Sequence, residues 1–163
     1  MVEKLFYRPV EKGDLKKICA LPQSSEELFF MSPKTEYPLS VDQLESSIKN
    51  RFASTVFLHN EEIVAFANFY EVEENQFCAI GNVIVNSRFR NRGIGEFVIK
   101  TMEHIAIEKY NVSAFHMSCF NTNTNALLLY SKLGYIPYEI EMRINSESKR
   151  FALIKLKRET DPL

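Results

Sequence analysis

The sequence predicts a single α+β domain in which a mixed, mostly antiparallel sheet is flanked by helices. Strand-like segments outnumber helical ones, and most neighbouring strands are separated by short polar turns of the kind that join hairpins. One strand-like segment is instead followed by a long helix-like segment and another strand, which indicates a crossover between parallel strands. The length of 163 residues fits one domain, so we expect residues 1–163 to form a single unit.

The chain begins with a predicted strand and a predicted helix. Residues 4–10 are interpreted as the strand. After it, Leu15, Ile18 and Cys19 recur at helical spacing, and the helix is expected to end before Pro22 because proline interrupts a helix.

The next segment is less regular. Residues 22–39 contain three prolines and an apolar run at residues 28–31, so we interpret this segment as a loop or a broken helix. A capping-box pattern, Ser-Val-Asp-Gln at residues 40–43, then predicts a short helix that runs towards Lys49.

The middle of the chain changes to a period of two, which is typical of strands. Three segments are rich in β-branched and aromatic residues, and polar turns separate them. The segments are residues 55–59, 63–71 and 77–85. We therefore expect an antiparallel meander.

The last part of the chain alternates between the two periods. Apolar residues return to helical spacing from Gly93 to about Tyr110, which predicts an amphipathic helix that packs on a sheet. The further predicted elements are a strand at 112–120, a helix at 123–133 that Gly134 closes, and a hairpin of 136–144 with 150–156.

Composition excludes several classes of protein. The formal net charge is −1, so no overall field attracts nucleic acid or an anionic membrane. No stretch is apolar enough to span a membrane and the start does not resemble a signal peptide, so we expect a cytoplasmic protein. The three cysteines and three histidines lack the spacings of a disulfide framework or a zinc site, and we expect no metal.

The segment 83–95 carries the pattern that points to chemistry. An apolar strand leads into a loop with three arginines, and Gly93 and Gly95 stand at the start of the following helix. Free N–H groups at a helix start, together with the helix dipole, bind anions, and glycines allow a ligand to approach the backbone. We expect a polyphosphate there. No lysine follows either glycine and Val98 replaces a third glycine, which argues against the loops that bind ATP and NAD.

Two motifs resemble those of a known family. The segment 90–95, Arg-Asn-Arg-Gly-Ile-Gly, is similar to the Gln/Arg-x-x-Gly-x-Gly/Ala signature of the acetyl-CoA-dependent N-acetyltransferases of the GNAT superfamily. The segment 123–135 resembles the family's Asn-x-x-Ala-x-x-Leu-Tyr-x-x-x-Gly-Phe/Tyr motif. The opening segments 8–10 and 14–15 are similar to its first strand and helix, so the resemblance spans nearly the whole chain.

The resemblance implies a GNAT-like fold with a splayed pair of central strands, between which the pantetheine arm of acetyl-CoA inserts. It implies that the backbone of residues 83–85 binds the pantetheine as an added strand would, and that N–H groups of residues 90–95 bind the diphosphate. Lys132 is a candidate for the 3′-phosphate. The expected cofactor-binding residues are Val83, Ile84, Val85, Arg90, Asn91, Arg92, Gly93, Ile94, Gly95, Asn123, Ala126, Tyr130 and Lys132.

The resemblance also implies a catalytic residue. Tyr130 occupies the motif position whose hydroxyl lies near the sulfur, and it is expected to protonate the departing CoA thiolate. Ala126 and Leu133 share its helical face, so a purely structural core tyrosine is the competing interpretation. We expect Tyr130→Phe to lower turnover, and wild-type turnover in that variant would remove the catalytic assignment.

The base that removes the proton from the amine stays unassigned. The family's strand glutamate is missing, and Ser118 occupies a second family position. Asn82 could orient a water molecule but cannot accept a proton. The remaining candidates, acting through ordered water or by direct titration, are Glu71, Glu73, Glu139, Glu141 and His116.

The function expected from the resemblance is N-acetylation of a primary amine with acetyl-CoA as cosubstrate. The acceptor is a small metabolite, a drug-like amine, or a peptide or protein amine, and the loop-like run Phe29-Phe30-Met31 is a candidate wall for it. One alternative is a CoA-binding sensor or scaffold without turnover, and another is an unrelated nucleotide-binding module. The final hairpin could pair with a second subunit, so a homodimer is a further possibility.

Overall fold

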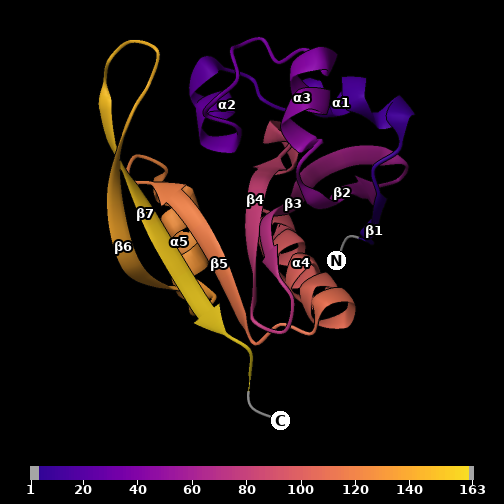
Figure 1. The fold of residues 1–163 in the computed structure, drawn as a ribbon. Helices are drawn as coiled ribbons and strands as arrows, with labels where there is room; N and C mark the ends of the chain where they lie inside the picture. Colours follow the sequence, from indigo (N-terminus) through magenta and orange to yellow (C-terminus); the bar gives the residue numbers. More distant parts are fainter. Residues whose placement is uncertain (1–3, 162–163) are drawn as a thin grey trace.

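The computed structural model describes residues 4–161, which form one seven-stranded sheet with helices packed against it (Figure 1). The strands are β1 (Phe6–Pro9), β2 (Phe52–His59), β3 (Glu62–Glu73), β4 (Phe77–Val85), β5 (Ala114–Phe120), β6 (Ile136–Ile144) and β7 (Arg150–Glu159). The helices are α1 (Leu15–Cys19), α2 (Ser25–Met31), α3 (Val41–Ile48), α4 (Ile94–Tyr110) and α5 (Thr124–Lys132), with 3₁₀ turns η1 (Lys12–Asp14) and η2 (Ser87–Phe89). The α+β class is confirmed.

The sheet is mixed and mostly antiparallel. Its strand order is β1-β2-β3-β4-β5-β7-β6, and only the pair β4–β5 is parallel. The predicted meander is therefore formed by β2, β3 and β4, and α4 is the predicted crossover. Because β7 lies between β5 and β6, the last hairpin puts β6 at an edge of the sheet.

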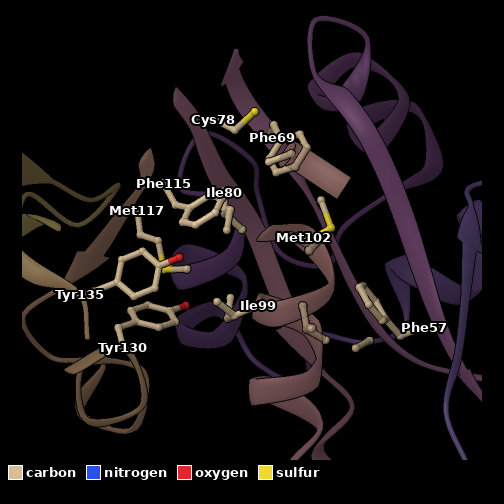
Figure 2. Packing of buried hydrophobic residues seen from close by; sticks show 14 of the residues in the cluster. Phe57, Phe69, Cys78, Ile80, Ile99, Met102, Phe115, Met117, Tyr130 and Tyr135 are labelled. Carbon is tan, nitrogen blue, oxygen red and sulfur yellow. The ribbon is translucent and has the colours of Figure 1, made fainter. Parts of the chain in front are cut away.

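Two hydrophobic clusters hold the helices on the sheet. One cluster packs α4 and α5 against strand residues such as Phe57, and Figure 2 shows part of it around Met102. The other packs α1, α2 and α3 against residues such as Val56. Val56 and Phe57 are neighbours in β2 that enter different clusters, since successive side chains of a strand point to opposite faces.

The central strands β4 and β5 separate along their length. They pair only from Phe77 opposite Ala114 to Ile80 opposite Met117. Beyond these residues both strands continue without pairing to each other, and Figure 1 shows their diverging ends. The splayed pair that the resemblance implies is therefore present.

A β-bulge helps β4 turn away from β5. The register with β3 shifts by one residue between Phe66 and Asn68, and Asn82 in this stretch has a φ of 51°. Asn82 donates to the Met31 carbonyl (2.7 Å) and accepts from Asn68 (2.9 Å), so α2 is tied to the bulge. Neither its positive φ nor its partners can be inferred from local sequence.

The region interpreted as a loop or a broken helix contains the helix α2. The Ser24 hydroxyl caps it by accepting from the Glu27 N–H at 3.1 Å. At α3, the Ser40 hydroxyl accepts from the Gln43 N–H, as the pattern predicts. The second hydrogen bond of the predicted capping box, from the Ser40 N–H to the Gln43 side chain, is wrong. The Gln43 side chain instead binds the backbone of Glu36, at 2.7 and 3.1 Å, because the preceding loop folds back over this helix.

Candidate active site

A small cavity lies where β4 and β5 separate. Its volume is about 40 Å³, and it opens between the unpaired parts of the two strands. It is lined by Phe30, Ile80, Gly81, Asn82, Val83, Met117, Ser118, Cys119, Phe120, Asn123 and Tyr130. The structure thus brings together Val83, Asn123 and Tyr130, three of the expected site residues that are up to 47 positions apart in the chain.

The loop from β4 to α4 presents backbone donors at the open end of the splay. Gly93 precedes the helix with a φ of 80°, a left-handed conformation that favours glycine. The first hydrogen bond at this end runs from the Phe97 N–H to the Gly93 carbonyl at 3.1 Å. The N–H groups of residues 94–96 consequently have no acceptor within the helix, which is the arrangement that binds a phosphate.

The arginines of this loop are not the free charges that the sequence suggests. Arg88 forms an ion pair with Glu62, and Arg90 forms one with Glu27. Arg90 also donates to the Val85 carbonyl at 3.2 and 3.3 Å, so that carbonyl is already engaged. Both acids come from distant parts of the chain. The backbone N–H groups, rather than a net positive charge, are therefore the candidate donors to an anion at this loop.

Arg92 packs on an aromatic ring, and Asn91 contributes a left-handed backbone conformation to the loop. The Arg92 guanidinium lies over the Phe89 ring, 5.1 Å from its centroid. Asn91 has a φ of 63° and, like Arg92, is exposed. The loop conformation thus depends on two left-handed residues, Asn91 and Gly93, on either side of Arg92.

Gly95 has a packing role. A Cβ atom at this position would lie 3.0 Å from Leu129 Cδ2, so the absence of a side chain lets α4 approach α5 closely. Ile94 is buried in the same cluster that Ala126 packs against. This close packing is enough to explain a glycine at position 95, without a contact between Gly95 and the cofactor.

Lys132 lies on α5 facing the start of α4. Its Nζ is 3.5 Å from Glu96, which also pairs with Lys100 at 3.0 Å. These lysines lower the pKa of the Glu96 carboxyl. In this structure Lys132 therefore joins two helices at the edge of the proposed phosphate site.

Tyr130 is 7% exposed, and its ring lies beside that of Tyr135 (Figure 2). Its hydroxyl has no hydrogen-bond partner within residues 4–161. Burial, and to a lesser degree the neighbouring Cys119, raises the pKa of this phenol. Tyr130 therefore stays protonated at neutral pH and can donate a proton into the cavity.

Asn123 stands at the N-terminus of α5 with a half-buried side chain that does not cap the helix. No hydrogen bond from this side chain reaches another of the described residues. Cys119, next to it, donates weakly to the carbonyls of Phe120 and Asn123 at 3.6 and 3.8 Å. Burial raises the pKa of the Cys119 thiol to about 12, so it is no nucleophile at neutral pH.

The candidate bases do not line the cavity. Glu71, Glu73 and Glu139 are exposed. Glu141 is bound by Lys155 (2.7 Å) and Arg143 (2.5 Å), and these hydrogen bonds lower its pKa.

His116 and Asn82 are also engaged. The His116 ring stacks on Phe77 with centroids 4.1 Å apart, and burial lowers the pKa of the imidazole. Asn82 is 5% exposed, and its amide is already hydrogen-bonded to α2 and β3. It therefore connects these elements and does not position a water molecule.

Aromatic residues form the wall of the splay on the α2 side. Phe29 stacks on Phe120 (4.4 Å between centroids) and contacts Phe151 (4.8 Å). Phe30 lines the cavity, whereas Met31 is buried in the α1–α3 cluster. Two of the three residues of the expected acceptor wall thus lie at the splay.

Sequence reasoning missed Tyr70. Its hydroxyl lies 3.1 Å from the Ser118 hydroxyl and so joins β3 to β5 across β4. Gly81, a small residue in an otherwise apolar strand, was the one local indication that something crosses β4 at this point.

The splayed strands, the donors at a helix start and the buried phenol between them define a CoA-dependent acyltransferase. The match to a family model agrees. Residues 18–135 match the acetyltransferase (GNAT) family, and the chain belongs to that family. It is an acyltransferase, and acetyl-CoA is its cosubstrate.

Solved structures with the same fold have low sequence identity. The ribosomal-protein-S18-alanine N-acetyltransferase from Escherichia coli is 18% identical, with a TM-score of 0.75 over 98% of this chain and 96% of that one. The spermidine N-acetyltransferase from Vibrio cholerae, in complex with CoA and spermine, is 16% identical, with a TM-score of 0.78 and 95% of each chain covered. A Salmonella typhimurium protein with its cofactor acetyl-CoA is 12% identical, with a TM-score of 0.75 over 98% and 95%.

No curated protein matches the sequence. Of the helices between residues 4 and 161, none has the length and apolar character that a membrane span requires. The same part of the chain contains no group of three His, Cys, Asp or Glu side chains placed to hold a metal ion.

Proposed function

We propose that this protein transfers the acetyl group of acetyl-CoA to a primary amine by direct attack of the amine on the thioester. The observation that carries the proposal is the buried, unpartnered hydroxyl of Tyr130 in the cavity between the unpaired parts of β4 and β5. A buried hydroxyl without a partner is costly, so its persistence is best explained by a role in binding or catalysis.

The residues present suit acetyl-CoA, which supplies an activated acetyl group as a thioester. The edge of β4 at residues 83–85 lacks a strand partner on the side of β5 and can bind an extended pantetheine. The N–H groups of residues 94–96 can bind the diphosphate. The Asn123 side chain offers a free amide in the cavity between the strands, and Lys132 can reach a phosphate if it leaves Glu96.

Tyr130 acts as the general acid in this proposal. Burial raises the pKa of the phenol, so the proton is present at neutral pH, and the same burial keeps bulk water away from it. An alkylamine has a pKa of roughly 10, so the acceptor must lose a proton before it attacks.

The acceptor is a small-molecule or peptide amine. The aromatic wall of Phe29, Phe30 and Phe120 supports an amine with an apolar part next to the nitrogen. One solved neighbour is a spermidine N-acetyltransferase and another a ribosomal-protein-S18-alanine N-acetyltransferase, so the neighbours support both a small amine and a peptide amine.

The test is release of CoA thiol with three primary amines: spermidine, 2-phenylethylamine and alaninamide. We expect Tyr130→Phe to lower kcat more than tenfold with little change in acetyl-CoA affinity, because only a proton donor is lost. Tyr138→Phe, on an exposed ring of β6, serves as the control. Wild-type turnover in the Tyr130 variant would remove the assignment.

A CoA-binding sensor is the second candidate, because no carboxylate lines the cavity. Calorimetry with acetyl-CoA distinguishes the two. Tight binding without transfer to any of the three amines would favour the sensor, and transfer to one of them would exclude it.

A further inference from the structure

We propose that Tyr70 and Ser118 form a hydrogen-bonded relay that carries a proton from the acceptor amine to solvent, a role that rests on the proposed function. The two hydroxyl oxygens are 3.1 Å apart. Ser118 directly follows Met117, the last β5 residue that pairs with β4, and it lines the same cavity as Tyr130. The relay therefore begins at the point where the strands separate.

The sheet is built so that Tyr70 reaches this point. The register between β3 and β4 shifts between Phe69 and Glu71, which leaves Tyr70 as the extra residue of a bulge. Bulges redirect side chains, and this one lets the Tyr70 ring cross β4 towards β5.

Gly81 makes the crossing possible. A Cβ atom there would lie 2.6 Å from Tyr70 Cδ1 and 2.8 Å from Arg51 Nη1, too close for any side chain. The Arg51 guanidinium lies over the Tyr70 ring, 5.7 Å from its centroid, and donates to Asn68 at 3.2 Å. The bulge at Tyr70, the absence of a side chain at Gly81 and the Arg51 guanidinium together fix the position of the Tyr70 ring.

The cavity offers few other routes for a proton. Its lining residues within the described part of the chain include no carboxylate and no imidazole. Cys119 and Tyr130 also line it, but Cys119 bonds to backbone carbonyls and the Tyr130 hydroxyl has no partner among the described residues, so neither is linked to a second hydroxyl as Ser118 is. Ser118 lies at the boundary between the cavity and the exposed surface, where Tyr70 is 37% exposed.

A hydroxyl pair can pass on a proton without either group becoming charged for long. The amine proton passes to Ser118 Oγ, the Ser118 hydrogen passes to Tyr70 Oη, and the Tyr70 hydrogen passes to water, so both residues keep their hydrogen count. The nitrogen loses two protons as its bond to the acetyl carbon forms and the carbon–sulfur bond breaks. One leaves through the relay, and the second returns to the Tyr130 oxygen, which has given its own proton to the CoA sulfur.

Several charged and titratable groups surround Tyr70. Burial raises the pKa of its phenol, and so do the charges of Glu71 and Tyr138, whereas Ser118 and Lys155 act in the opposite direction. Tyr70 is therefore neutral in the working pH range, as a relay requires, and is no permanent base.

The test is the pH profile of kcat/KM for Tyr70→Phe and Ser118→Ala, measured with each of the three amines that the wild-type protein accepts. Tyr70→Phe removes the phenol hydroxyl but keeps the ring, and Ser118→Ala removes the serine hydroxyl but keeps the backbone and Cβ. We expect about a tenfold loss at pH 7 that shrinks as pH rises, because more of the amine is then neutral in solution. Acetyl-CoA affinity should stay within twofold. Tyr37→Phe, at an exposed tyrosine that does not act on Tyr70, should keep the wild-type profile.

The outcomes separate the two proposals. A loss that is the same at every pH would indicate a structural role and overturn the relay, as would wild-type profiles in both variants. A wild-type protein that acetylates none of the three amines would overturn the proposed function and the relay with it. A pH-dependent loss in both variants supports both.

Discussion

The side chain of Glu103 is a buried carboxylate that serves the fold rather than the reaction. It accepts from the Tyr135 hydroxyl at 2.6 Å and pairs with Arg158 at 2.9 Å. Tyr135 belongs to the motif that predicts the site, yet its hydroxyl is occupied by this pair while that of Tyr130 is not. Two tyrosines five positions apart therefore have different roles.

We expect Glu103→Gln to lower the free energy of unfolding by about 2 kcal/mol, because Arg158 loses its buried counter-charge. Urea denaturation measures the loss. Glu108→Gln, on an exposed position of the same helix, is the matched control and should change stability little. Equal stability of both variants would contradict the role of the pair.

Residues that meet from distant parts of the chain could not be predicted. The sequence shows three arginines in the loop without an acid nearby, whereas Glu27 and Glu62 reach two of them in the fold. Tyr130 could be assigned because its motif is local. Tyr70 could not, because its contact with Ser118 spans 48 positions and depends on a bulge.

At the scale of elements, the β4–α4 loop depends on two left-handed residues, Asn91 and Gly93, and Gly93 is the one that can be tested by adding a side chain. Gly93 has a φ of 80°, and a Cβ atom there would meet nothing within 4 Å, so conformational strain is the only cost of a side chain. We expect Gly93→Ala to cost about 1 kcal/mol of stability and to weaken CoA binding about tenfold as the loop shifts. Calorimetry with CoA measures the affinity.

Gly13→Ala is the control for this loop. Gly13 also has open space around it, but it has no positive φ. An alanine there should leave CoA affinity unchanged. If Gly93→Ala binds CoA as the wild type does, the loop is not the diphosphate site.

The edge strand β6 carries an exposed apolar row. Ile136, Tyr138, Ile140, Met142 and Ile144 are 43–69% exposed. Antiparallel pairing with a second copy about Met142 would place Ile140 opposite Ile144 and Glu141 opposite Arg143 of that copy. Such pairing gives hydrogen-bond partners to the backbone groups on the outer edge of β6 and places Glu141 of one copy opposite Arg143 of the other.

We therefore expect a dimer whose stability depends on β6. Met142→Lys should give a monomer in sedimentation velocity, because lysine on an edge opposes pairing. Leu128→Lys, on an exposed position of α5, should remain a dimer. A monomeric wild-type protein at high concentration would exclude this arrangement.

Element order follows from periodicity almost everywhere. Strong period-two and helical segments predict the meander, the crossover and the final hairpin because each buries one face. The helix α2 was ambiguous, since prolines flank it on both sides, and tertiary packing of Leu28 and Met31 decides it. The bulges in β3 and β4 have no such pattern.

At the scale of the whole molecule, Asp14 and His116 are two of the groups that make stability depend on pH, beside the carboxyls of Glu96 and Glu141, whose pKa values are also lowered. The pKa of Asp14 is lowered mainly by its hydrogen bond to Arg8 (2.6 Å), and the pKa of His116 is lowered mainly by burial. Both shifts favour the deprotonated form in the folded state. Stability is thus present above the unfolded pKa values, about 6.5 for His and 3.9 for Asp, and is lost as pH falls below each.

We expect urea midpoints to fall in two steps between pH 7 and pH 3. Asp14→Asn should make the lower step smaller, because the contributions of Glu96 and Glu141 remain, whereas Asp42→Asn, exposed on α3, should keep both steps at full size. Midpoints that do not change over this range would contradict the assignment.

The splay itself is a property of the whole sheet. Both strands are predicted correctly, but periodicity contains no information on where two strands stop pairing. Only the resemblance to a family implied the gap, and the pairing limits at Ile80 and Met117 locate it.

The ion pair between Glu27 and Arg90 has a consequence for the order of events. Arg90 belongs to the turn that would receive the diphosphate, and Glu27 belongs to the helix whose next turn supplies Phe30 to the amine side. If CoA fixes the loop that holds Arg90, the ion pair to Glu27 also fixes α2, and with it Phe30 on the amine side of the cavity. We therefore expect sequential addition, in which acetyl-CoA binds before the amine.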